Sequence, residues 1–97
     1  MIVLITGATA GFGKATAQLF ASKGFDLIIT GRRTQRLNDL KKEIESMHKV
    51  NVIALDFDIR NFSQVERAIN ELPDSFKKIE LLVNNAGLAV GMSSIHD

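Results

Sequence analysis

The fold of this chain is decided by the stretch Thr6-Gly7-Ala8-Thr9-Ala10-Gly11-Phe12-Gly13. This stretch joins an apolar run over residues 2–6, predicted to be a strand buried on both faces, to a helix predicted over residues 11–23. Gly7 can take the tight turn that leaves the strand, Gly11 lets backbone amides approach a pyrophosphate, and Gly13 lets the helix pack closely on the sheet. The stretch therefore indicates a phosphate-binding loop, although glycines at strand–helix turns also occur for steric reasons alone.

We compared this stretch with the sequence patterns of two known nucleotide-binding loops. A P-loop needs a glycine, four further residues and then Gly-Lys-Ser/Thr. Gly13-Lys14 is present, but Ala8 stands where the first glycine belongs, and Ala15 replaces the hydroxyl that binds magnesium. The dinucleotide pattern G-x-G-x-x-G also fails, because residue 9 is Thr9. The pattern that remains is Thr-Gly-x-x-x-Gly-x-Gly, which has three residues rather than one between its first two glycines.

Beyond the loop, apolar runs alternate with amphipathic segments. Further buried strands are predicted over residues 27–30, 50–55 and 79–83. Thr34 is predicted to cap a second helix, and Ser63 with Glu66 matches a capping box that opens a third helix ending at Pro73. The predicted apolar faces are Ala15, Leu19 and Phe20 in the first helix, Leu37, Leu40, Ile44 and Met47 in the second, and Val65, Ile69 and Leu72 in the third.

This alternation predicts an α/β fold. Strands separated by helices of this length pair in parallel, with helices on both faces of the sheet. Right-handed crossovers then give the order 3-2-1-4, which is the first half, β-α-β-α-β-α-β, of a Rossmann-type doubly wound sheet. With 97 residues, the chain is one domain at most.

Composition excludes several classes of function. Twelve basic and eleven acidic residues leave a net charge of +1, so neither nucleic acid nor an anionic membrane is an expected partner. No apolar stretch approaches the length of a membrane span, and the apolar start has no basic region before it, so we expect a cytoplasmic protein. Without cysteine, and with only two histidines, no disulfide and no metal site are expected.

The end of the second predicted strand indicates the cofactor. An NAD enzyme places Asp or Glu there to accept hydrogen bonds from the ribose 2′-hydroxyl. This chain has Thr30-Gly31-Arg32-Arg33, and a guanidinium can pair with a 2′-phosphate that a carboxylate would repel. NADP is therefore the predicted cofactor, unless the two arginines only decorate an exposed turn. Arg36, one helical turn along, either assists or is an ordinary surface residue.

Three motifs together resemble the short-chain dehydrogenase/reductase family. They are the glycine stretch, Asp58 just after the third predicted strand, and Asn84-Asn85-Ala86-Gly87 after the fourth. The resemblance runs from residue 2 to about residue 92. Within the family, Gly-Ala-Thr-Ala-Gly-Phe-Gly, Thr-Gly-Arg-Arg, Asp-Ile-Arg-Asn and Asn-Asn-Ala-Gly-Leu-Ala are similar to the NADP-dependent 3-hydroxy acid (serine-type) dehydrogenases.

The resemblance implies further cofactor contacts. Asp58 would bond the adenine amino group, Ile59 would pack beside the ring, and the segment around Asn85 would pass under the ribose. From the residues alone, Asp56, Asp58 and Asn61 could equally satisfy turn backbone. The residues assigned to cofactor binding are Gly7, Thr9, Ala10, Gly11, Phe12, Gly13, Arg32, Arg33, Asp58, Ile59, Asn85, Ala86 and Gly87.

No catalytic residue is assigned in this chain. The family uses a tyrosine with a lysine four residues later, plus a serine, and this chain has no tyrosine. Ser93, Ser94, His96 and Asp97 are too crowded in sequence to suggest a hydrolytic triad.

The resemblance implies the N-terminal, NAD(P)-binding portion, residues 1–97, of a longer dehydrogenase that acts on a small hydroxy or carbonyl substrate and forms a homo-oligomer. The alternatives are a non-catalytic nucleotide-binding module, or a fragment that associates through the exposed edge of Leu81-Leu82-Val83.

Overall fold

Four parallel strands in the order β3-β2-β1-β4 form the centre of the computed structural model, which describes residues 1–8, 11–56 and 61–84. The strands are β1 (Ile2–Thr6), β2 (Asp26–Gly31), β3 (Val52–Asp56) and β4 (Leu81–Asn84). Both the parallel pairing and the predicted strand order 3-2-1-4 are confirmed.

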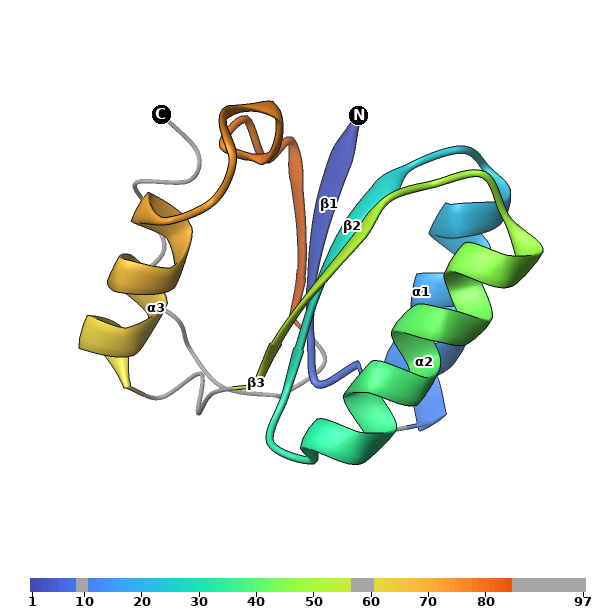
Figure 1. Cartoon of the computed structure of the whole chain (residues 1–97), viewed down its shortest axis with the longest axis horizontal. Helices are drawn as coiled ribbons and strands as arrows, with labels where there is room; N and C mark the ends of the chain where they lie inside the picture. Colours follow the sequence, from blue (N-terminus) through green and yellow to red (C-terminus); the bar gives the residue numbers. More distant parts are fainter. Residues whose placement is uncertain (9–10, 57–60, 85–97) are drawn as a thin grey trace.

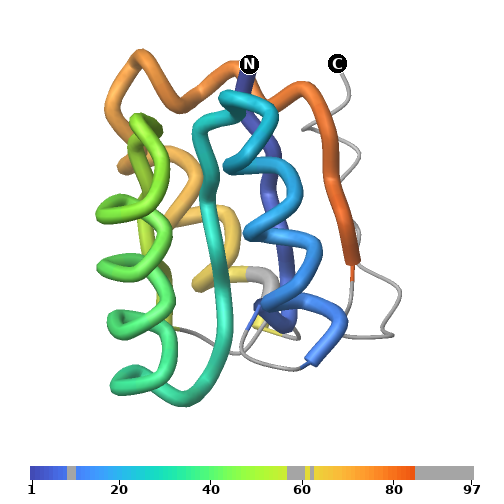
Figure 2. Tube along the Cα trace, turned by 90° about the vertical axis from the view of Figure 1, so that its right-hand side faces the viewer, coloured from blue at the N-terminus to red at the C-terminus, as the bar shows by residue number. Residues whose placement is uncertain are grey.

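Helices cover both faces of this sheet (Figure 1). The helices α1 (Gly11–Ser22) and α2 (Thr34–Met47) lie on one face, and α3 (Phe62–Asn70) lies on the other, followed by the short 3-10 helix η1 (Asp74–Phe76). Figure 2 shows α1 and α2 side by side over the strands. Within the described ranges, no helix is both long enough and apolar enough to cross a membrane.

Alternation along β1 divides the core in two. Val3 and Ile5 are fully buried with the apolar residues of α1 and α2, whereas Ile2 and Leu4 are buried with Val65 of α3 and its neighbours. All five residues of β1 are buried, as expected of a strand covered on both faces. The continuous apolar run of residues 2–5 therefore builds both core layers at once.

The contact face of α1 differs from the predicted one. Of the predicted residues, Phe20 packs partly buried against the core, but Ala15 is exposed and Leu19 is 54% exposed. The buried residues of α1 are Gly13, Ala17 and Ala21. Small residues at a spacing of four let the helix axis approach the sheet closely, and this outweighs the burial of a larger leucine. In α2, Leu37, Leu40 and Ile44 form the predicted stripe, but Met47 is 62% exposed because it is the last residue of the helix.

Both predicted helix caps were wrong. The N-cap of α2 is Arg33 rather than Thr34, and the Thr34 hydroxyl donates to the Asp56 carboxylate instead. The N-cap of α3 is Asn61, whose side-chain oxygen accepts from the backbone N–H of Gln64 at 3.2 Å. The predicted Ser63–Glu66 capping box is therefore not the start of α3.

Several element boundaries differ from the predicted ones because buried apolar residues continue beyond the hydrogen-bonded helix or strand. The third and fourth strands begin two residues later than predicted, because Val50 and Ile79 are buried in the core without belonging to a strand. Leu72 is likewise buried after α3 has ended at Asn70. An apolar run in the sequence indicates which residues are buried, and buried residues extend beyond the ends of the hydrogen-bonded strands and helices. The predicted stop of α1 is confirmed by Gly24, which has a φ of 87°.

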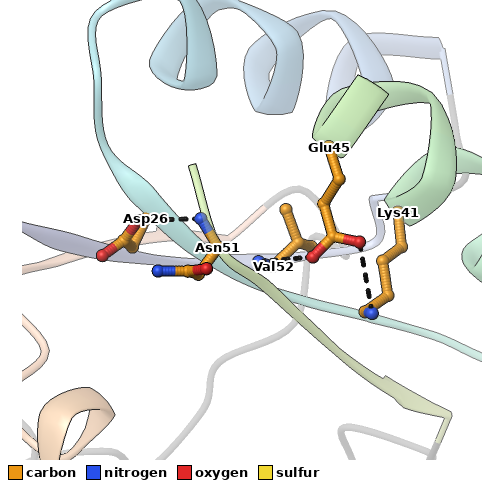
Figure 3. Close-up of polar contacts among 5 residues, drawn as sticks. All are labelled: Asp26, Lys41, Glu45, Asn51 and Val52. Atoms are coloured by element: carbon orange, nitrogen blue, oxygen red, sulfur yellow. Dashed lines mark hydrogen bonds and ion pairs between the residues drawn. The ribbon is translucent and has the colours of Figure 1, made fainter. Parts of the chain in front are cut away.

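At the edge of the sheet where the strands begin, two carboxylate side chains accept hydrogen bonds from the backbone at the start of β3 (Figure 3). The Asp26 carboxylate accepts from the backbone N–H of Asn51 at 2.9 Å, and the Glu45 carboxylate accepts from that of Val52 at 3.3 Å. Lys41 pairs with Glu45 at 3.4 Å. These contacts lie away from the carboxyl ends of the strands, where the candidate site is found.

Candidate cofactor-binding site

The carboxyl ends of the four strands meet at one edge of the sheet, the lower edge in Figure 1. Thr6 at the end of β1 is in register with Asn84 of β4, and Gly31 at the end of β2 is in register with Asp56 of β3. The loop after β1 is tied to β2, because the backbone N–H of Ala8 donates to the Thr30 carbonyl at 3.0 Å. In open parallel sheets, ligands bind outside this edge.

Gly7 and Gly13 have the geometry that the sequence predicted. Gly7 has a φ of 64°, a left-handed conformation that glycine adopts without steric cost, and there the chain turns out of β1. A β-carbon on Gly13 would lie 2.1 Å from the Gly7 carbonyl oxygen and 2.8 Å from the α-carbon of Ala8. Since both neighbours are backbone, residue 13 has no room for a side chain. The two glycines together bring the start of α1 against the end of β1.

Gly11 and Phe12 show the opposite arrangement. A β-carbon on Gly11 would meet no atom of the described neighbours within 4 Å, and the Phe12 side chain is 86% exposed. Packing of the described core therefore does not account for a glycine at position 11 or an aromatic ring at position 12. Both belong to the first turn of α1, where backbone N–H groups lack helical partners and the helix carries a partial positive charge.

Thr6 and Asn84 form a part-buried hydrogen bond that sequence reasoning missed. The Thr6 hydroxyl donates to the Asn84 side-chain oxygen at 2.8 Å, and Thr6 is fully buried. This bond orients the Asn84 amide at the carboxyl edge, immediately before the Asn85-Ala86-Gly87 segment. Two polar residues at the ends of adjacent apolar strands were the available signal, but pairing them required the strand register.

The arginines predicted to select the cofactor follow β2. Arg32 and Arg33 are both exposed, and Arg33 has extended backbone, with φ −97° and ψ 91°, where it caps α2. Their placement agrees with the predicted position at the carboxyl edge.

Arg36 is exposed in the first turn of α2 and lines a hollow of about 360 Å³ between α1 and α2. The other lining residues are Lys14, Asp39, Leu40 and Glu43. Lys14 and Glu43 form an ion pair at 3.9 Å across this hollow.

Several predicted site residues lie outside the described part of the chain. They are Thr9, Ala10, Asp58, Ile59, Asn85, Ala86 and Gly87. Their cofactor contacts remain predictions. Over residues 1–8, 11–56 and 61–84, no group of three His, Asp or Glu side chains is placed to hold a metal ion.

Comparison with known proteins gives consistent matches along the whole sequence. The sequence model of the family described as short chain dehydrogenase matches residues 1–97. Sulfoacetaldehyde reductase 2 of Chromohalobacter salexigens is 47% identical over 96 residues, which are 99% of this chain and 37% of that protein. NADP-dependent 3-hydroxy acid dehydrogenase YdfG of Salmonella typhi is 46% identical over 96 residues, again 99% of this chain and 37% of that protein.

Among solved structures, serine dehydrogenase from Escherichia coli matches with a TM-score of 0.81 and 46% identity. The match covers 95% of this chain and 41% of that one. The chain thus spans well under half the length of the relatives that it matches.

Proposed function

The chain belongs to the short-chain dehydrogenase family, and from this premise we propose that it binds NADP(H) as the cofactor-binding portion of a longer oxidoreductase. The observation that carries the proposal is the turn between β1 and α1. There Gly13 is packed on the Gly7 backbone, and the start of α1 is brought to the carboxyl edge of the sheet. Residues 1–97 are then the N-terminal NAD(P)-binding part of the whole protein.

The residues at this turn fit a pyrophosphate. An exposed glycine at the first position of α1 lets backbone N–H groups approach a bulky anion, and the helix dipole favours negative charge there. We assign Gly7, Thr9, Ala10, Gly11, Phe12 and Gly13 to this part of the cofactor. Asp58 and Ile59 are proposed for the adenine, and Asn85, Ala86 and Gly87 for the region of the cofactor's ribose.

The end of β2 supports NADP(H) over NAD(H). The two residues that follow β2 are the exposed Arg32 and Arg33, where an NAD enzyme carries a carboxylate. A guanidinium pairs with a phosphate in forked geometry and with charge assistance. The name of the 3-hydroxy acid dehydrogenase relative, 46% identical to this chain, states NADP dependence.

For the whole protein, we propose hydride transfer between NADP(H) and a small hydroxy or carbonyl substrate. The bound nicotinamide accepts or donates the hydride, and the protein positions it against the substrate. A 3-hydroxy acid such as serine is the proposed substrate class, on the likeness to the 3-hydroxy acid and serine dehydrogenases. This chain contains no tyrosine, so a Tyr-x-x-x-Lys pair for proton transfer would have to lie outside it. A cytoplasmic location and a homo-oligomeric state complete the proposal.

Titration of the protein with NADPH and with NADH tests the cofactor assignment. We expect NADPH to bind at least about tenfold more tightly, and the paired change Arg32→Ala with Arg33→Ala to remove that preference while NADH binding changes little. Arg67→Ala is the matched control, because Arg67 is an exposed arginine on α3, on the other face of the sheet. Equal affinity for the two cofactors in the unmodified protein would refute the NADP assignment.

Association through the sheet edge is a second candidate function, favoured by one observation. Within the described residues β4 is an edge strand, and Leu81 in it is 41% exposed. Light scattering of the purified protein tests this idea. If the edge mediates association, Leu81→Lys lowers the molar mass in solution, whereas an unchanged mass argues against it.

A further inference from the structure

One residue, Asp56, holds both ends of the Arg32-Arg33 segment. Its backbone is in register with Gly31, the last residue of β2, and its carboxylate accepts the hydroxyl of Thr34, the first residue of α2. Between these two points lie only Arg32 and Arg33. A short loop fastened at each end to the same residue has few backbone conformations left to it.

The Thr34 hydroxyl is used here in an unusual way. A threonine at a helix start commonly accepts from the backbone N–H groups of the first turn, and the sequence predicted that use. Instead Arg33 takes the N-cap position and provides no side-chain cap within the described chain, while Thr34 donates across to β3. The start of α2 therefore lacks a side-chain cap from Arg33, and the loop before it is hydrogen-bonded to β3 through Thr34.

The rest of α2 is already fixed without this bond. Leu37 and Ile44 are buried against the sheet, and the backbone N–H of Leu37 donates to the Arg33 carbonyl at 2.9 Å. The Thr34–Asp56 bond therefore adds little to the placement of the helix. Its specific effect is on the two residues that precede the helix.

We propose that Thr34 and Asp56 form a positioning pair that holds Arg32 and Arg33 ready for the 2′-phosphate, and so sets the preference for NADP(H) over NAD(H). This inference rests on the proposed function. Binding a phosphate through two adjacent arginines fixes the backbone that carries them, and a loop whose backbone is held beforehand loses less conformational entropy on binding.

The test measures the dissociation constants for NADPH and NADH with the whole protein, together with the midpoint of thermal unfolding. Thr34→Val removes the donor at nearly constant volume and keeps the charge of Asp56. This change is expected to weaken NADPH binding about tenfold, a size consistent with having to order the backbone of two residues on binding, and to change NADH binding less than about twofold. Thr34→Ser keeps the hydroxyl and is expected to restore NADPH binding.

Two further variants sharpen the test. Asp56→Asn keeps an oxygen that accepts the hydroxyl and removes a negative charge near the phosphate, so NADPH affinity should not fall below that of the unmodified protein. Ser46→Ala is the matched control, because it removes a hydroxyl that bonds the Glu43 carbonyl at the far end of α2. It should leave both dissociation constants unchanged.

Each contrary result has a distinct meaning. In Thr34→Val, equal weakening of NADPH and NADH binding would show that the pair has a purely structural role. A lower unfolding midpoint with unchanged binding would show the same. Either result would overturn this inference and leave the proposed cofactor standing. A selective loss of NADH affinity in Asp56→Asn would place the carboxylate on the ribose, which also overturns it. No NADPH preference in the unmodified protein would overturn the proposed cofactor, and this inference with it.

Discussion

Gly13 lies so close to Gly7 that a β-carbon at position 13 would stand 2.1 Å from the Gly7 carbonyl oxygen. Non-bonded carbon and oxygen atoms do not approach to that distance, so either α1 or the loop must move if residue 13 gains a side chain. Gly11, two residues earlier in the same turn, has no described atom within 4 Å of the same hypothetical carbon. The two glycines therefore have separable roles, one in packing and one at the proposed ligand surface.

Gly13→Ala is expected to lower the free energy of unfolding by about 3 kcal/mol, because the added methyl meets backbone atoms that cannot rotate away. NADPH binding should fall with it, since the loop would be displaced. Urea unfolding followed by circular dichroism measures the first effect, and cofactor titration measures the second. Wild-type stability in this variant would show that α1 can shift without cost.

Gly11→Ala is the matched change on the ligand side. We expect the free energy of unfolding to change by less than about 0.5 kcal/mol, because the new methyl meets no described protein atom. NADPH affinity is nevertheless expected to drop at least about tenfold, since the methyl would stand between the backbone and the pyrophosphate. Full NADPH affinity in Gly11→Ala would place the pyrophosphate elsewhere.

The sequence was most informative where a feature depends on local conformation or on simple periodicity. The glycine loop could be predicted because Gly7 and Gly13 are required by a turn and a close contact within a few residues of each other. The strand order followed from alternation and crossover handedness. The cap of α2 could not be predicted in this way, because Thr34 finds its partner 22 residues away in β3. At the start of α3, Asn61 and Ser63 are both local candidates for the cap, and the sequence alone did not separate them. The Thr6–Asn84 bond joins residues 78 positions apart, and only the register between strands brings them together.

The start of α3 gives a direct test of the corrected cap. Asn61→Ala removes the side-chain oxygen that accepts from the N–H of Gln64, and should cost about 1 kcal/mol of unfolding free energy. Ser63→Ala, at the residue that the sequence favoured, should cost less than about 0.5 kcal/mol because Ser63 is exposed inside the helix. Chemical denaturation of the two variants side by side distinguishes them. The reverse order of costs would restore the capping box.

Two apolar residues on the same side of α2, Ile44 and Met47, differ in burial and can be compared by substitution. Ile44 is fully buried against the sheet, so Ile44→Ala is expected to lower the free energy of unfolding by about 2–5 kcal/mol through lost burial and a cavity. Met47 continues the same helical spacing, but its side chain is 62% exposed, and Met47→Ala should cost less than about 0.5 kcal/mol. If Met47→Ala were instead as costly as Ile44→Ala, the buried stripe would extend to the end of the helix.

Within the described residues β3 is an edge strand, and the Glu45 carboxylate bonds the first residue of this strand, Val52. Glu45→Ala removes the carboxylate that accepts from the Val52 N–H at 3.3 Å, and should lower the free energy of unfolding by about 1 kcal/mol. Glu45→Gln keeps an accepting oxygen and should cost about half as much or less. Lys41→Ala breaks only the partly exposed ion pair to Glu45, which is expected to contribute less than about 0.5 kcal/mol.

The order of these three costs, measured by denaturant unfolding, separates the two roles of Glu45. If Lys41→Ala proved as costly as Glu45→Ala, the ion pair along α2 would be the stabilising interaction. If Glu45→Ala alone is costly, the carboxylate acts by bonding the backbone of an edge strand, whose unpaired N–H groups would otherwise face solvent or another chain.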